Sequence, residues 1–269
     1  MLVDITTEEY LNLKDHISNS LMNLFRKSPE DFHAQFNLAA SVVADRTHST
    51  DLGDWVHEAV LEPERFSSRL TVIPADYLSK SGARAGAAWK EFRDSPENVG
   101  KLLLRQKEVD HVMQMRRGVL NNPRAKELVE ANGFFESTVV WECTVSGLKR
   151  RVRYDKIIPG HGWLDLKTSK DVRPGYFINS IREYNYDTQA AFYRDAYEFT
   201  YGDKGEFTLI AIDNRAKEEP PCECYTLTSL EFENSGKIVD DTLLEIARRV
   251  RENDWPLPEV EIRLEDIVF

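Results

Sequence analysis

The residue types most able to do chemistry in this sequence are gathered in one stretch, RVRYDKIIPGHGWLDLKTSKD. It contains Asp155, then Asp165 ten residues later, then Lys167 two residues further on. Side chains two residues apart on a β-strand point to the same face, so Asp165 and Lys167 are expected to lie together. A hairpin can bring Asp155 to the same end of the sheet. Two carboxylates and an ammonium at close range are the groups that a hydrolytic Mg²⁺ site requires.

A bare D-x-K has a commoner explanation, a surface charge ladder in which Lys167 pairs with an acid on the next strand. Other positions favour the catalytic interpretation. His57 follows Gly53 by four residues in GDWVH, and Gln189 and Tyr193 are four residues apart on one face of a predicted helix. The joint order is G-x-x-x-H, then D, then D-x-K, then Q-x-x-x-Y. That order is more specific than any one of its pieces.

The first half of the chain is predicted to be mainly helical, in HISNSLMNLFRKSPEDF, DLGDWVHEAVL, RAGAAWKEFRDS and residues 108–120. From Phe134 the period changes, and alternation of apolar and polar residues predicts strands in FESTVVWECTV, LKRRVRYDKII and GWLDLKT. A helix over residues 187–200, strands in EFTLIAIDN and CECYTLTSL, and a long helix over residues 229–253 follow.

This order of elements predicts an α/β fold with a central mixed sheet flanked by helices. We expect one domain over residues 1–269. Its parts would be a mainly helical segment (1–133), a catalytic sheet (134–228), and a C-terminal helix and tail (229–269).

The net charge is −11, which argues against a protein that coats nucleic acid non-specifically. The charge is unevenly placed, however. Residues 145–217 carry 13 basic and 10 acidic residues, whereas residues 218–269 carry 5 basic and 14 acidic ones. The three cysteines cannot form a disulfide framework or a four-cysteine iron–sulfur site, and no run approaches the roughly 18 apolar residues of a membrane span. A cytoplasmic protein without a membrane partner is expected.

The combined pattern resembles the RecB-type branch of the PD-(D/E)XK nuclease superfamily, and most closely the RecE-type exonucleases of phages and prophages, which are related to lambda exonuclease. The resemblance covers nearly the whole chain. It runs from HISNSLMNLFRKSP through VHEAVLEPERF, GFFESTVVWECTVSGLKRRVRYDKI, WLDLKTSKD and YNYDTQAAFYRDAYE to NDWP. One departure is that Tyr154, and not proline, precedes Asp155. The fold that the resemblance implies is the restriction-endonuclease-like PD-(D/E)XK core.

The resemblance also implies a role for each matching residue. Asp165 would bridge two Mg²⁺ ions, with Mn²⁺ as an alternative, and Asp155 would ligate one of them. The backbone carbonyl of Leu166 would complete that site, and His57 would reach the second metal. Lys167 would orient or deprotonate the attacking water and stabilise charge on the phosphorane.

Supporting roles follow from the same resemblance. Gln189 and Tyr193 would buttress the site and contact the DNA backbone. Glu136 in FFES matches a recurrent acidic position and would be a supporting or metal-linked acid, with Glu142 as a nearby competitor.

Basic residues surround the two aspartates, and we expect them to contact DNA phosphates. The alternative is a strand edge guarded by charge. The residues are Arg150, Arg151, Arg153, Lys156, Lys170 and Arg173, with Lys149 beside them. Trp163, Tyr176 and Phe177 would stack on the bases of a frayed end or, as is commoner for aromatics at sheet margins, belong to the core.

The resemblance implies a metal-dependent 5′→3′ exodeoxyribonuclease that acts on linear double-stranded DNA and leaves 3′ single strands for homologous recombination. It further implies a homo-oligomeric ring (a trimer or tetramer), a single-strand annealing protein as partner, and the cytoplasm of a bacterial host. The alternatives are a nuclease of other polarity, an endonuclease, and a catalytically silent DNA-binding or assembly module. The intact Asp155, Asp165 and Lys167 favour an active enzyme.

Overall fold

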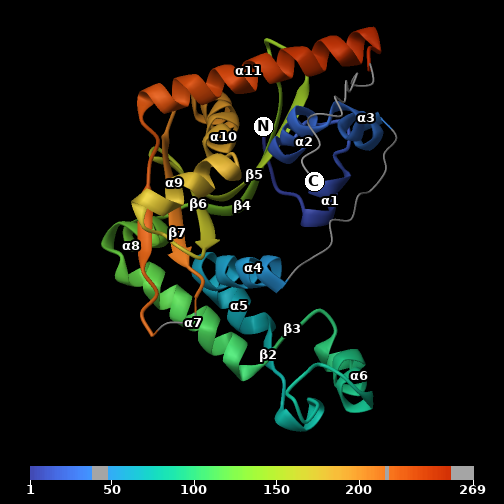
Figure 1. Cartoon of the computed structure of the whole chain (residues 1–269), viewed down its shortest axis with the longest axis vertical. Coiled ribbons are helices and arrows are strands. Elements are labelled where there is room, and N and C mark those ends of the chain that lie inside the picture. The colour runs from blue at the N-terminus through green and yellow to red at the C-terminus, as the bar shows by residue number, and fades with distance from the viewer. Residues whose placement is uncertain (38–47, 216–217, 256–269) are drawn as a thin grey trace, which may run out of the picture.

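Six of the strands in the described residues form one mixed sheet (Figure 1). The computed structural model describes residues 1–37, 48–215 and 218–255. The strand order is β1-β4-β5-β6-β7-β8, in which β6 and β7 are parallel and the other neighbours are antiparallel. The bounds are Leu2–Val3 (β1), Phe134–Glu142 (β4), Lys149–Ile158 (β5), Gly162–Ser169 (β6), Glu206–Asp213 (β7) and Cys222–Tyr225 (β8).

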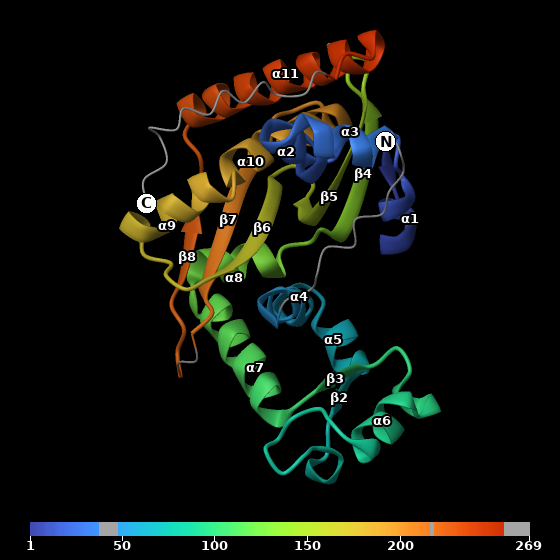
Figure 2. The ribbon, with the colours of Figure 1, turned by 45° about the vertical axis from the view of Figure 1, so that its right-hand side comes forward.

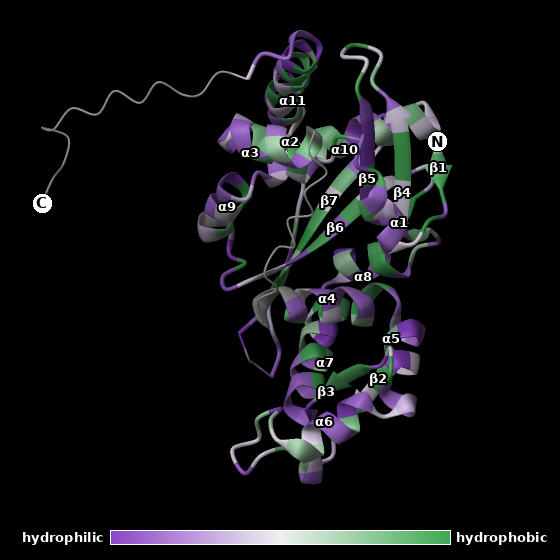
Figure 3. Ribbon diagram, turned by 90° about the vertical axis from the view of Figure 1, so that its right-hand side faces the viewer, coloured by the Kyte–Doolittle hydropathy of each residue, from purple (hydrophilic) through white to green (hydrophobic). Residues whose placement is uncertain are grey.

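β7 shows why this sheet carries helices on both faces. Its residues alternate between two cores, with Phe207 and Leu209 in one and Ile210 and Ile212 in the other. A strand that is apolar on both faces must be covered on both. Figure 3 shows the hydrophobic character of β6 and β7 against the more hydrophilic β5.

The two helical layers contain different parts of the chain (Figures 1 and 2). The first layer holds α2 (Asn19–Lys27), α3 (Pro29–Asn37), α9 (Pro174–Glu183), α10 (Tyr186–Tyr201) and α11 (Ser229–Glu252). The second holds α4 (His48–Leu61), α5 (Pro63–Arg69), α7 (Gln106–Asn121) and α8 (Pro123–Glu130). A short α1 (Thr7–Asn12) follows β1.

A separate segment extends away from the main sheet (Figure 2). In it, two short parallel strands pair with each other and lie beside helical turns. Its elements are β2 (Leu70–Val72), η1 (Ala75–Tyr77), α6 (Ala87–Asp94), η2 (Pro96–Asn98) and β3 (Leu102–Leu104).

The expected α/β fold with a central mixed sheet is confirmed. Ser18 caps α2 by accepting a hydrogen bond from the Leu21 amide at 3.2 Å. β1, β2 and β3 were not predicted, because strands of two or three residues are too short to show a period, and the helices α1, α5, α8 and α9 were not predicted either. The expected tail lies outside the described residues from position 256 on, and no helix among the described residues is long and apolar enough to cross a bilayer.

Candidate active site

β5 and β6 form a fork, and the two predicted aspartates lie where it opens. The two strands pair only from Lys156↔Leu164 to Ile158↔Gly162. Asp155 and Asp165 are the next residues beyond the last pair on their respective strands. With no β5 carbonyl opposite, the Leu166 amide donates to Asp155 Oδ2 at 2.8 Å. Because the ladder ends here, the Asp155 carboxylate lies against the backbone of Leu166, the residue that follows Asp165.

α4 places His57 at the same fork. Its Nδ1 lies 2.7 Å from the Gly53 carbonyl oxygen and its Nε2 lies 3.0 Å from Asp155 Oδ2. A carbonyl oxygen only accepts, so Nδ1 must carry a hydrogen and Nε2 is the atom that faces the site. The G-x-x-x-H spacing is explained by this contact, because residues four apart on a helix are neighbours.

Lys167 and Gln189 both hold Asp165. The lysine Nζ lies 2.6 Å from Oδ2, and Gln189 Nε2 donates to Oδ1 at 3.1 Å. These contacts join the D-x-K of β6 to the Q-x-x-x-Y of α10. Asp165 is buried, so its two oxygens are directed by fixed neighbours and not by solvent.

Two tyrosines of α10 line the same region. The Tyr193 ring packs edge-on against Tyr154, with centroids 5.1 Å apart, and burial together with the nearby carboxylates holds its pKa well above the usual range. Tyr186 was not predicted, yet Lys167 Nζ lies 5.2 Å from its ring centroid. The signal was available: Tyr186, Gln189 and Tyr193 are spaced i, i+3 and i+7 and so share one helical face.

Glu136 lies opposite Asp155, where the β4–β5 ladder is interrupted. The paired residues are Phe135↔Lys156 and Ser137↔Tyr154, and Glu136 between them has a φ of 47°. Such a left-handed non-glycine residue stores roughly 1–3 kcal/mol and is typical of functional sites. Burial and the Asp155 charge raise the pKa of Glu136. Glu142 pairs with Lys149 at the other end of the strand, away from the fork.

The charges at the fork determine each other's protonation. Burial would lower the pKa of His57, but the Asp155 carboxylate raises it to about 9. Burial would raise the pKa of Asp155, whereas the His57 imidazolium lowers it below its ordinary value. Burial raises the pKa of Asp165, and the two carboxylates raise that of Lys167 despite its burial. Asp155 is therefore the better ionised of the two acids.

The donor set of the fork suits a divalent metal, although it is not arranged around one. Across the described ranges, no three His, Cys, Asp or Glu side chains converge closely enough to hold a metal ion. His57 instead pairs with Asp155, and Lys167 pairs with Asp165. Asp165 Oδ2 is nevertheless buried, and the contact given for it is the Lys167 ammonium at 2.6 Å. Carboxylate oxygens and an imidazole are ordinary ligands of divalent cations, so these residues fit the expected metal.

The raised pKa of His57 gives a first prediction for the metal-free protein. Its folded value of about 9 exceeds the ordinary 6.5, so its pairing stabilises the fold fully below pH 6.5. That contribution is lost as the pH rises through about 9. In EDTA, NMR titration of the imidazole nitrogens should place His57 near 9, and Asp155→Asn should return it towards 6.5. Glu142→Gln is the matched control. A His57 that titrates at 6.5 in the unaltered protein contradicts the pairing.

The structure corrects two of the six expected DNA contacts. Arg150 is 1% exposed, lies between the rings of Trp141 and Phe192, and pairs with Asp195 at 2.8 Å. Lys156 is fully buried and donates to backbone carbonyls at the end of α8. Neither side chain has surface to offer to a phosphate.

The other four basic residues keep some exposure. Lys170 and Arg173 are exposed in the loop that follows β6, whereas Arg151 and Arg153 are half-buried, Arg151 against Tyr10 and Arg153 in an ion pair with Glu136. Of the three aromatic residues considered for base stacking, Trp163 and Phe177 belong to the core and Tyr176 is exposed.

Comparison with known proteins agrees with this geometry. Residues 18–261 match the family described as "PDDEXK-like domain of unknown function (DUF3799)". The chain belongs to this family. Its PDDEXK-like fold is also found in a crystal structure from Eubacterium rectale, of a protein named "putative exonuclease". The TM-score is 0.65 over 98% of each chain, at 14% sequence identity, a level at which the likeness concerns the fold alone. No curated protein sequence matches the chain.

Membership of the PD-(D/E)XK superfamily is thus confirmed, and these findings support a nuclease. Asp155, Asp165 and Lys167 lie at the open end of the β5–β6 fork within the matched range.

Proposed function

We propose that this PDDEXK-like protein is a RecE-type, metal-dependent exodeoxyribonuclease. It degrades linear double-stranded DNA in the 5′→3′ direction and leaves 3′ single strands for homologous recombination. The observation that carries the proposal is the convergence of two aspartates, a lysine and a helical histidine at the β5–β6 fork. A structural charge ladder would not require the backbone and side-chain contacts that direct each of these groups inward.

Each residue has a task in hydrolysis that follows from its surroundings. His57 Nε2, Asp155, Asp165 and the backbone at Leu166 would hold Mg²⁺ or Mn²⁺. When bound, the cation supplies a lowered pKa for water and neutralises phosphate charge. Lys167 has a raised pKa and stays protonated, which favours orienting water and stabilising the phosphorane over acting as a base. Gln189 keeps Asp165 in place through its 3.1 Å hydrogen bond.

A degradation assay tests the proposal and separates it from its alternatives. End-labelled linear duplex and closed circular DNA are incubated with Mg²⁺, with Mn²⁺, or with EDTA, using the unaltered protein and Asp165→Ala. We expect loss of the linear duplex with metal only, and none with the variant. Survival of the linear duplex in Mg²⁺ and Mn²⁺, or equal digestion by the variant, would refute the proposal. Nicking of the circle would favour an endonuclease.

Polarity and assembly need their own measurements. Comparing release of a 5′ label with release of a 3′ label establishes direction. We propose a homo-oligomeric ring, a trimer or tetramer, because an enzyme that encircles DNA can act processively, and a single-strand annealing protein as the partner that receives the 3′ strand. Light scattering of the purified protein tests the ring, and a monomer at working concentration would contradict it.

A further inference from the structure

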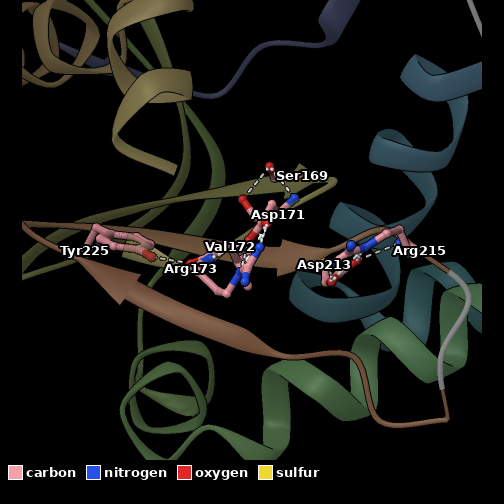
Figure 4. A network of polar contacts seen from close by, with 7 residues as sticks. All are labelled: Ser169, Asp171, Val172, Arg173, Asp213, Arg215 and Tyr225. Carbon is pink, nitrogen blue, oxygen red and sulfur yellow. Dashed lines mark hydrogen bonds and ion pairs between the residues drawn. The ribbon is translucent and has the colours of Figure 1, made fainter. Parts of the chain in front are cut away.

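The two parallel strands β6 and β7 end in the same local motif, an aspartate that holds the arginine two residues later. After β6, Asp171 accepts from the Arg173 backbone amide at 3.0 Å and from its Nη2 at 2.6 Å. At the end of β7, Asp213 accepts from the Arg215 backbone amide at 2.9 Å and from its Nη2 at 2.5 Å. In both motifs the arginine Nε donates to the same carboxylate. Figure 4 shows the two motifs beside each other.

Backbone contacts fix the two motifs relative to each other. The register pairs Ser169 with Asp213, and the Asn214 amide donates to the Ser169 carbonyl at 2.8 Å. The Tyr225 hydroxyl of β8 donates to the Val172 carbonyl, so a third strand holds the loop that carries Arg173. Arg215 therefore lies just beyond the end of β7, and Arg173 lies on a loop that β8 holds.

In each motif the carboxylate occupies one edge of the guanidinium, and the Arg173 guanidinium also lies 4.3 Å from the centroid of the exposed Tyr176 ring. The carboxylates occupy the Nε–Nη2 side, while a guanidinium offers five N–H donors in a planar fork. Arg173 is 65% exposed and Arg215 is 50% exposed, whereas their aspartates are 22% and 0% exposed. A half-buried and a buried carboxylate thus each hold an exposed guanidinium by one side, which leaves N–H donors on the remaining side, and a guanidinium can bind phosphate through two such donors at once.

The motifs lie close to the proposed active site. Lys167 and Ser169 are two residues apart on β6, about 7 Å at the usual strand rise. Exposed Lys170 lies between Ser169 and Asp171 and adds a positive charge to the rim. Since phosphates on one DNA strand advance by about 3.4 Å along the duplex axis, this rim is within reach of a backbone whose scissile phosphate lies at Lys167.

We propose that Arg173 and Arg215 together form a phosphate-binding rim that holds the DNA backbone next to the scissile phosphate. Asp171 and Asp213 are positioning residues that aim the two guanidinium groups. Arg215 carried no functional expectation from the sequence, and the rim deepens the proposed function, on which it rests, by naming how the duplex is held beside the fork.

The salt dependence of DNA binding tests the rim without turnover. Anisotropy of a labelled linear duplex in EDTA gives the affinity at several salt concentrations for the unaltered protein and for the double variant Arg173→Gln/Arg215→Gln. We expect binding about ten-fold weaker or more and a log–log salt slope smaller by about two, one for each lost phosphate contact. With Mg²⁺, KM should rise while kcat stays within about three-fold.

Arg93→Gln is the matched control, because Arg93 on α6 also holds an aspartate side-on, Asp94, and is 51% exposed. It should leave the slope unchanged. A double variant with the affinity and slope of the unaltered protein would overturn the rim while leaving the nuclease proposal intact. An unaltered protein that neither binds nor cuts DNA would overturn both.

Asp171→Asn tests whether Asp171 positions Arg173, because the two possible answers predict opposite changes in DNA affinity. The substitution makes the rim more positive, so charge alone predicts tighter binding. If the carboxylate aims Arg173, binding should instead weaken by roughly three-fold with an unchanged salt slope, because the contact remains but is less well directed. Tighter binding by this variant would show that Asp171 does not position the arginine.

Discussion

Replacing Lys167 with methionine is expected to lower the rate of phosphodiester cleavage by about 10²–10⁴-fold, the range for loss of a positioned acid–base or charge-stabilising group. Methionine preserves length and apolar volume but removes the ammonium that lies 2.6 Å from Asp165 Oδ2. The lysine is held between that carboxylate and the Tyr186 ring. These two contacts fix its positive charge, which under the proposed function would stabilise the negative charge of the transition state.

Single-turnover cleavage with excess enzyme measures this rate, and anisotropy measures DNA affinity in parallel. Affinity should change by less than about three-fold, since one group at the scissile phosphate contributes little to the backbone contacts that dominate binding. Lys126→Met, an exposed lysine on α8, is the control and should leave both quantities unchanged. Lys167→Arg retains a cation beside Asp165, so it serves as a control for loss of activity through misfolding of Lys167→Met. A fully active Lys167→Met protein would show that the lysine only balances buried carboxylates.

The residues of the fork could be predicted from the sequence because short spacings along the chain place them in pairs. Asp165 and Lys167 are two residues apart on a strand, and Gly53 and His57 are four apart on a helix, so element type alone places each pair on one face. The meeting of the pairs depends on where the β5–β6 ladder ends. No local period encodes that ending, and the expectation that the pairs share one site came from the family resemblance.

The same period explains the error at Arg150 and Lys156. On β5 the residues at 150, 152, 154 and 156 are all buried, and Val152 and Tyr154 identify that face as the inward one. Charge suggests exposure, but the alternation of β5 puts both cations in phase with its buried apolar residues. The sequence does not show which groups accept hydrogen bonds from these buried cations. Those acceptors lie on α10 for Arg150 and on α8 for Lys156, both distant from β5 in the sequence.

Arg215 was missed for a related reason. Neither DVR nor DNR is a recognisable motif in isolation, and each pairs an acid with a base that appear to cancel. Only the parallel pairing of β6 with β7 sets the two motifs side by side. The proposed function of each ion pair depends on the side of the guanidinium that the carboxylate leaves exposed. That side is set by geometry and cannot be read from composition.

Lys156→Met is expected to destabilise the fold by about 2–4 kcal/mol, because the lysine satisfies buried backbone groups that nothing else is placed to reach. Its Nζ donates to the carbonyl oxygens of Leu128, Val129 and Ala131 at 3.1, 2.6 and 2.5 Å. These carbonyls belong to the C-terminal end of α8, where a helix has no internal donors left. Methionine fills the space but leaves them without this donor, so thermal unfolding should begin roughly 5–15 °C lower.

The effect of pH distinguishes this role from simple packing. Burial lowers the pKa of Lys156 to about 8, below its ordinary 10.5, so between those values the folded state binds fewer protons than the unfolded state. Stability from this group therefore rises with pH across that interval, and Lys156→Met should lose the rise as well as the hydrogen bonds. Denaturant unfolding at pH 7 and pH 9.5 measures both, with Lys126→Met on the same helix as control. A Lys156→Met protein as stable as that control, with weaker DNA binding and a smaller salt slope, would return Lys156 to the DNA-contacting residues and refute its burial.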